Sequence, residues 1–231
     1  EKFGNSFALM CVAWVLSGIL GLVLGIVAGY FKDRLPDRLI RGYALLLAST
    51  PAFWIGLLLL MIFAVWLGWL PFGMNLPAGM TAAEAGIGVR IRHLLLPALT
   101  LGLTGVANIT LHTREKMIAI MESDYVLFAR ARGESSGYIV KRHALRNLVL
   151  PAITLQFGSI SEIFGGSVLV EQVFSYPGLG QAAIDAGLGS DVSLLLAITV
   201  ISTLFVFLGN LVANVLYGVI DPQIRRGRSH G

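Results

Sequence analysis

The chain has 231 residues, a formal net charge of +4 and a composition that excludes an ordinary soluble domain. Hydrophobic residues make up 56% of it and charged residues only 13%. The mean hydropathy is +0.79, and these values together indicate a membrane protein. The single cysteine, Cys11, excludes a disulfide framework and gives no spacing for a metal site.

Apolar stretches of roughly 20 residues recur along the chain, and each can cross a hydrocarbon core of about 30 Å as a helix. The fourth stretch reaches full length only by continuing through Glu162 to about residue 170. We therefore predict an all-α fold, a polytopic transmembrane bundle that forms one domain over residues 1–231. The predicted spans cover about 7–30, 43–70, 94–113, 148–169 and 192–219.

The first span carries a ridge of small residues, because Ser17, Gly21, Gly25 and Gly29 recur every four residues. Lipid supplies no hydrophobic drive between helices, so a ridge of this kind lets two backbones approach closely. The ridge predicts packing within this chain, and contact with a partner subunit is the alternative.

Three prolines lie in or near the spans. Pro51 follows Ser49 and Thr50 inside the second span and predicts a kink there, with the two hydroxyls bonding carbonyls that the proline frees. Pro97 and Pro151 are expected near the starts of the third and fourth spans, where proline costs little.

The distribution of cations predicts the orientation. Residues 31–42 hold four Lys or Arg, residues 114–147 hold seven and the tail 221–231 holds three, which leaves only Lys2, Arg90 and Arg92 on the other side. The cation-rich side is therefore predicted to be cytoplasmic, and topology explains the net charge without nucleic acid. This places the amino terminus outside, so we expect an upstream segment, such as a further helix; a cleaved signal is the alternative.

The cytoplasmic segment 114–147 is longer than a connection requires. Apolar residues at helical spacing predict an amphipathic helix over 115–132 that continues the third span. Gly133 is expected to end it, and residues 134–137 to form a turn with a new N-cap. The apolar stripe indicates a partner surface, and a merely solvated basic loop is the alternative. The stripe consists of Met117, Ile118, Met121, Tyr125 and Phe128.

Two features concern the pathway and the outer face. Glu162 lies at mid-span, and an ionisable residue there by default suggests a translocation pathway; a hydrogen-bonded glutamate between helices is the alternative. Two external loops are predicted, at about 71–93 and 170–191. The second contains an apolar tip over 173–180 that is expected to gate the pore or to dock a partner, and a plain turn-rich loop is the alternative.

Short motifs are spread along nearly the whole chain. They are Asp33-Arg-Leu-Pro-Asp37, Ser49-Thr-Pro-x-Phe-Trp54, His93-x-x-Leu-Pro97, Asp124-Tyr-Val-x-x-Ala-Arg-Ala-Arg-Gly133, Arg142-His-Ala-Leu-Arg-Asn147, Gly165-Gly166, Glu171-x-Val-Phe-Ser-Tyr-Pro-Gly-Leu-Gly180 and Asp221-Pro-x-Ile-Arg225. Together they resemble the first permease subunit of the dipeptide, oligopeptide and nickel ABC importers. The general Glu-Ala-Ala loop motif of ABC permeases reads here as Leu127-Phe128-Ala129, with Gly133 in place and the leading Glu absent.

The resemblance implies a type I ABC importer permease fold in a bacterial or archaeal cytoplasmic membrane. It also implies a second homologous permease subunit, two ATPase subunits that hold ATP and Mg, and an extracytoplasmic substrate-binding protein. No cofactor is expected in this chain, which lacks a Gly-x-x-x-x-Gly-Lys-Ser/Thr phosphate loop. The cytoplasmic segment would then seat in an ATPase as a coupling helix.

Residue roles follow from the same resemblance. Tyr125, Phe128 and Ala129 would form the apolar plug in the ATPase. Gly133 would permit the turn, and Arg130, Arg132 and Lys141 would make charge contacts at the rim. At the outer face, the gate or docking residues would be Tyr176, Pro177, Gly178 and Gly180.

The cargo stays open between peptides, glutathione-like molecules and nickel chelates, because Ser161-Glu-Ile-Phe-Gly-Gly166 resembles the nickel-type permeases more than most peptide-type ones. Two other classes remain as alternatives. A self-powered secondary transporter or channel would not need the cytoplasmic segment. An intramembrane enzyme would need paired catalytic groups in the spans, and no such motif is found.

Overall fold

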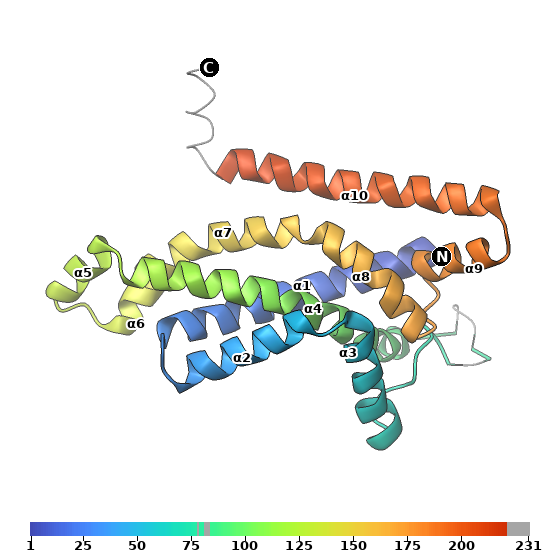
Figure 1. Cartoon of the computed structure of the whole chain (residues 1–231), viewed down its shortest axis with the longest axis horizontal. Coiled ribbons are helices and arrows are strands. Elements are labelled where there is room, and N and C mark those ends of the chain that lie inside the picture. The colour runs from blue at the N-terminus through green and yellow to red at the C-terminus, as the bar shows by residue number, and fades with distance from the viewer. Residues whose placement is uncertain (78, 81–83, 221–231) are drawn as a thin grey trace, which may run out of the picture.

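The computed structural model describes residues 1–77, 79–80 and 84–220, without the side chains of 150 and 216–220, and these residues form helices and no strand. The all-α prediction is confirmed. The Asp221–Arg225 motif and the cationic tail lie outside the described residues. The elements, labelled in Figure 1, are α1 (Lys2–Tyr30), α2 (Leu35–Ser49), α3 (Ala52–Leu59), η1 (Leu60–Trp66), α4 (Ile87–Met121), α5 (Asp124–Ala131), α6 (Ser136–Ile139), η2 (Val140–Ala144), α7 (Leu145–Gly158), α8 (Ile160–Val173), α9 (Leu179–Leu188) and α10 (Val192–Ile220).

Three helices, α1, α4 and α10, are long and apolar enough to cross a membrane as single rods. Two further helix pairs pass the same test but are bent at a short break: α2 with α3–η1 by 109°, and the run from α6 to α7 with α8 by 49°. The described residues therefore contain up to five spans if each bent pair counts as one. The long helices run along the length of the molecule, with α5 and α6 at one end and α9 and the amino terminus at the other (Figure 1).

The small-residue ridge of α1 forms a seam with α4. A Cβ atom added at Gly21 would meet Ile109, one at Gly25 would meet Thr113, and one at Gly29 would meet Met117. The two backbones therefore approach closely, which maximises dispersion contacts where lipid offers no hydrophobic drive. The prediction of packing within this chain is confirmed.

The chain bends sharply between α2 and α3. The two hydroxyls do bond carbonyls there: the Ser49 hydroxyl donates to the Leu45 carbonyl at 2.9 Å and the Thr50 hydroxyl to the Leu46 carbonyl at 2.7 Å. The prediction is wrong about which carbonyl is affected, because the Leu47 carbonyl, four residues before Pro51, accepts instead from the Thr50 N–H at 3.2 Å. The expected kink within one span 43–70 is wrong in degree: α2 ends at Ser49 and the bend is 109°. The loop expected over 31–42 is also mostly helical, since Pro36 in the first turn of α2 favours a helix start at Leu35.

Pro97 and Pro151 lie inside α4 and α7, so the prediction that they lie near helix starts is wrong. Both helices begin before the predicted spans: α4 begins at Ile87 and not at about 94, and α7 begins at Leu145 and not at about 148. In a bundle, neighbouring helices and local π-turns accommodate an interior proline. A π-helical turn, η2, lies directly before α7.

Two loop predictions also need correction. The helix expected over 115–132 is broken, because α4 ends at Met121 and α5 begins only at Asp124. The external segment 170–191 is mostly helical: α8 continues to Val173 and α9 follows the short turn 174–178.

Candidate functional site at the two ends of the bundle

The inner end carries α5, a short helix with one buried and one exposed face. Val126 and Ala129 are fully buried against Ile139 of α6. On the other face, Tyr125, Leu127 and Phe128 are exposed, and Phe128 reaches 69%. The α6 contact thus holds α5 so that large apolar side chains point away from the molecule.

This geometry changes the predicted plug. Ala129 was expected on the docking face, but its burial against Ile139 removes it from that face. Met117 is likewise buried, in a cluster with Ala144 and Leu148. Leu127, which the predicted stripe did not include, joins Tyr125 and Phe128 as an exposed apolar residue, because only the Val126 and Ala129 side of α5 is covered.

Cationic and turn residues surround this face. Arg130, Arg132 and Lys141 are all exposed. Gly133 has φ +81°, a left-handed conformation that glycine adopts without strain, and it directly follows the α5 C-cap as predicted. The next residue, Glu134, accepts a hydrogen bond from Arg132 at 2.6 Å and lies 3.2 Å from His143 Nε2. These contacts tie the turn between α5 and α6 to η2.

The predicted turn with a new N-cap is present after Gly133. Ser135 precedes α6, and its side-chain oxygen accepts a hydrogen bond from the Tyr138 backbone N–H at 3.4 Å. Tyr125 is also held from the other side, since the Asn147 amide donates to its hydroxyl at 3.2 Å. The orientation of α5 is therefore set by both α6 and α7.

Near this end, two ion pairs connect α2 and the turn before it to the C-terminal part of α4 and the residue after it. Arg114 donates to both carboxylate oxygens of Asp37, at 2.5 and 2.7 Å, and Asp37 is only 2% exposed. Lys32 pairs with Glu122 at 2.5 Å on the surface. Asp37 belongs to the motif that carries the resemblance, but its partner was not predicted because no spacing rule connects residues 77 positions apart.

The outer end is organised by Glu171, which is fully buried. Its carboxylate accepts hydrogen bonds from the Ser6 hydroxyl at 2.5 Å, from the Gly180 N–H at 2.7 Å and from the Gln181 N–H at 3.2 Å. The Ser6 oxygen in turn accepts from the Leu179 N–H at 2.8 Å. Glu171 and Ser6 therefore satisfy the first backbone donors of α9, which would otherwise lack partners.

The predicted gate or docking residues lie around this carboxylate. The Pro177 carbonyl accepts from the Asn5 amide at 2.9 Å, and a Cβ at Gly178 would clash with Glu171. Gly180 donates directly to Glu171. The sequence does not predict the buried capping role of Glu171, because Glu171 lies at the start of the predicted external loop. The one feature that indicates this role is its position directly after an apolar span and before a Pro-Gly turn.

Tyr176 is buried, and its backbone N–H donates to the Glu171 carbonyl at 2.8 Å. Burial, together with the Glu171 carboxylate, raises the pKa of Tyr176 to about 12, against a smaller opposing effect of Arg90. The phenol therefore remains protonated at all physiological pH values. Phe174 is buried as well, and its carbonyl accepts from the Met74 N–H at 2.8 Å, so the first external segment packs over the turn.

Glu162 lies elsewhere, in the first turn of α8, and is exposed on the surface of the chain. Its neighbour Ser161 exchanges hydrogen bonds with Asn210 of α10, at 3.0 and 3.2 Å. The structure thus brings Glu162 close to neither the outer turn nor α5, and it leaves the carboxylate on a face that other molecules can reach.

Comparisons with known proteins agree with this architecture. The chain matches the family described as binding-protein-dependent transport system inner membrane component over residues 21–226. It is 37% identical to the oligopeptide transport system permease protein AppB of Bacillus subtilis, over 96% of this chain and 70% of that protein. It is 35% identical to the glutathione transport system permease protein GsiC of Escherichia coli K12, over 97% and 69% of the two chains.

Among solved structures, the fold resembles an inward-facing structure of the MetNI methionine ABC transporter. The TM-score is 0.72, with 14% identity, and the match covers 95% of this chain and 94% of that chain. The fold is therefore that of an ABC importer permease, as predicted.

These findings together define a membrane-embedded transport component. The chain belongs to the binding-protein-dependent transport system inner membrane component family. The alternatives of a self-powered transporter, a channel and an intramembrane enzyme are thereby set aside.

Proposed function

We propose that this chain is one of two homologous permease subunits of an ATP-driven importer, which take up peptides through the path between them. The relatives named above are permeases for oligopeptides and for glutathione, which supports peptides as the cargo over nickel chelates. ATP and Mg are held by two separate ATPase subunits, and a substrate-binding protein delivers the cargo at the outer face. The chain crosses the cytoplasmic membrane several times.

The observation that carries this proposal is the exposed apolar face of α5. Tyr125, Leu127 and Phe128 project from a short helix beyond the end of α4, and Val126 on the opposite side fixes its orientation. Large apolar side chains exposed together on a small, well-anchored element mark a protein interaction site. On this proposal they seat in an ATPase subunit.

The surrounding residues fit the same role. Arg130, Arg132 and Lys141 supply charge at the rim, where such contacts steer association more than they add affinity. Gly133 allows the reversal of direction after α5. Because Glu134 holds both Arg132 and His143, movement of α5 is passed to η2 and hence to α7.

At the outer end, the turn that contains Tyr176, Pro177, Gly178 and Gly180 is proposed to meet the binding protein or to close the path. Tyr176, Gly178 and Gly180 are buried, so on this proposal they shape the turn and do not contact the partner themselves. The buried Glu171 carboxylate supports this role, because it presents the turn and α9 in one fixed conformation. Glu162, exposed on α8, is proposed to face the translocation pathway.

The test is coupled transport by the reconstituted complex of permease pair, ATPase subunits and binding protein in proteoliposomes. Phe128→Asp is expected to lower peptide uptake and binding-protein-stimulated ATP hydrolysis by at least about tenfold, since it places a charge in an apolar contact. Gly133→Val, which strains the left-handed turn, is expected to uncouple hydrolysis from uptake.

Leu35→Asp is the matched control, because Leu35 is 70% exposed at the start of α2, and the nearby Lys32 pairs with Glu122 just before α5. It should leave both activities within about twofold, as surface substitutions usually do. Normal uptake by Phe128→Asp, or an equal loss in Leu35→Asp, would contradict the proposed role of α5.

A further inference from the structure

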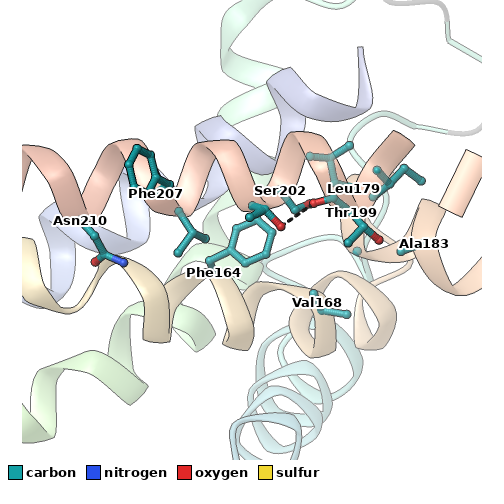
Figure 2. A pocket seen from close by; sticks show the side chains of 12 residues that line it. Phe164, Val168, Leu179, Ala183, Thr199, Ser202, Phe207 and Asn210 are labelled. Atoms are coloured by element: carbon teal, nitrogen blue, oxygen red, sulfur yellow. Dashed lines mark hydrogen bonds between the residues drawn. The ribbon is translucent and has the colours of Figure 1, made fainter. Parts of the chain in front are cut away.

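A groove of about 510 Å³ lies between α10 on one side and α8 and α9 on the other (Figure 2). Phe164 and Val168 of α8 and Leu179 and Ala183 of α9 form its apolar wall. A cavity of this size with a few polar groups is typical of sites that bind small molecules, which occupy about 300–1,000 Å³.

The α10 side of this groove is polar. Thr199, Ser202, Thr203 and Asn210 line it, at positions that place them on one face of the helix. Over residues 192–215, the only other polar side chains of α10 belong to Ser193 and Asn214. Polar side chains in a membrane-spanning helix are costly against lipid and face a partner or a pathway instead.

These side chains retain hydrogen-bonding capacity toward the groove. The hydroxyls of Thr199 and Thr203 donate to the carbonyls of Leu195 and Thr199, at 2.8 Å each, which leaves their oxygens able to accept. Asn210 donates from its amide to Ser161 and has a second amide hydrogen to give. The polar stripe of α10, which consists of Thr199, Ser202, Thr203 and Asn210, therefore offers both hydrogen-bond acceptors and a hydrogen-bond donor.

The length of the stripe matches an extended peptide. Residues 199 to 210 of an α-helix span about 16 Å at 1.5 Å per residue, which is the length of about five residues of extended chain. A peptide backbone presents alternating N–H and C=O groups along that length, and it must satisfy them when it leaves water. An acyl chain would leave unused the accepting capacity of the two threonine oxygens and the second amide hydrogen of Asn210.

The groove also adjoins the outer turn. Gly180 of α9 lines it and donates its backbone N–H to Glu171, so the groove lies next to the anchored turn. A peptide released at the outer turn therefore reaches the stripe on α10 without crossing another element.

We propose that this groove binds the backbone of a peptide in transit, extended along α10 and bonded to Thr199, Thr203 and Asn210. This rests on the proposed importer function and adds the site and the binding mode. The apolar wall of α8 and α9 would cover the peptide side chains without selecting a sequence, so this site contributes little to cargo choice.

The test uses cysteine accessibility, because Cys11 is the only cysteine in the sequence and Cys11→Ala removes it. In the reconstituted complex with that background, Ser202→Cys is treated with a hydrophilic methanethiosulfonate reagent. Ser193→Cys, on the same helix but outside the groove, is the control. We expect ATP, binding protein and tri-alanine or glutathione to slow modification of Ser202→Cys at least fivefold and to leave Ser193→Cys unchanged.

If ATP-dependent uptake persists, two other outcomes would overturn the proposed peptide site without affecting the proposed importer function. If peptide does not slow the modification of Ser202→Cys, the groove is an aqueous cavity that lies outside the translocation path. Reaction only with a lipid-soluble maleimide would show that lipid or the partner permease covers the groove. Absence of ATP-dependent uptake in the Cys11→Ala complex would overturn the proposed function itself, and the groove with it.

A second measurement addresses the hydroxyls directly. Thr199→Val with Thr203→Val keeps the side-chain shape and removes both hydroxyls, and it is expected to lower peptide uptake about tenfold, the combined effect of two hydrogen bonds at the weaker end of their usual range. Thr104→Val is the control, because the Thr104 hydroxyl also donates to a carbonyl of its own helix, Leu101, but lies on α4. Equal uptake by the two variants would contradict the proposal.

Discussion

At the scale of single residues, the two glutamates of α8 have opposite surroundings. The Glu171 carboxylate is fully buried and accepts hydrogen bonds from Ser6, Gly180 and Gln181. Glu162, on the same helix, is exposed. The same chemical group therefore has a structural role at one position and makes no buried contact of that kind at the other.

The substitution Glu171→Gln should destabilise the outer end of the molecule. The amide has one accepting oxygen in place of two, so it can accept either from Gly180 and Gln181 or from Ser6 but not from both sides, and the buried hydrogen bond that is lost costs about 1–3 kcal/mol. We expect a melting temperature several degrees lower for the detergent-solubilised protein, and weaker stimulation of ATP hydrolysis by the binding protein.

Glu162→Gln is the control for that prediction. Because Glu162 is exposed, its neutralisation should change the melting temperature little, while peptide uptake falls if it faces the pathway. Equal destabilisation by the two substitutions would contradict a structural role that only Glu171 has. Unchanged peptide uptake by the Glu162→Gln variant would show that Glu162 does not face the translocation pathway.

How far single residues could be predicted depended on whether their partners were local. Gly133 was placed correctly because a helix end and a glycine are adjacent in sequence. Ser6 gave no signal, since its partner Glu171 is 165 positions away and only the fold joins them. Ala129 was misplaced because helical spacing identifies an apolar face without showing which part of it the chain itself covers.

At the scale of elements, the α1–α4 seam depends on the absence of side chains. Gly25→Ala places a methyl group against Thr113 and is expected to destabilise the bundle by about 1–3 kcal/mol through overpacking. Thermal unfolding of the detergent-solubilised variant measures this loss of stability.

Gly4→Ala provides the comparison, because it lies in the same helix and a Cβ there meets nothing within 4 Å. Alanine favours helix by up to about 1 kcal/mol over glycine, so Gly4→Ala should be neutral or stabilising. A seam that tolerates Ala at position 25 as well as at position 4 would show that close approach is not required.

The ion pairs between α2 and α4 give a second prediction at this scale. Removing one member of a buried pair leaves an uncompensated charge, so Asp37→Ala and Arg114→Ala should each cost about 3 kcal/mol. The double variant should cost much less than the sum, and thermal unfolding of all variants tests this. Lys32→Ala, which breaks the exposed pair with Glu122, should cost below about 1 kcal/mol. Additive effects at Asp37 and Arg114 would contradict their coupling.

The elements were predictable in type more than in extent. Apolar runs located α1, α4 and α10, which are long and apolar enough to cross a membrane, and both bent helix pairs, because the cost of polar backbone in lipid constrains any sequence in the same way. The bend at Pro51 and the continuation of α8 to Val173 were not predictable in size, since packing sets both. The helix α9 was missed because its Gly-containing sequence is typical of a turn, and it forms where Glu171 and Ser6 cap its start.

At the scale of the whole molecule, α1 connects most of the other helices. Ser6 bonds Glu171 of α8, and the Trp14 indole donates to the Gln156 carbonyl of α7 at 2.8 Å, while the glycine ridge packs on α4. In contrast, α10 is little buried and lies along the edge of the bundle (Figure 1). The helices α1, α4 and α8 therefore share the main core of the bundle, with α5 at one end of the molecule and α9 at the other (Figure 1).

This arrangement requires α5 and α9 to lie on opposite sides of the membrane. The cations of residues 114–147 predict α5 on the cytoplasmic side, because the membrane retains positively charged loops there. In the Cys11→Ala background, Ser190→Cys after α9 should therefore react with a membrane-impermeant thiol reagent in intact cells. Ser136→Cys in α6 should react only after the cells are permeabilised, with a difference of at least about tenfold in labelling. Labelling of Ser136→Cys in intact cells would invert the topology, and it would separate α5 from any cytoplasmic ATPase.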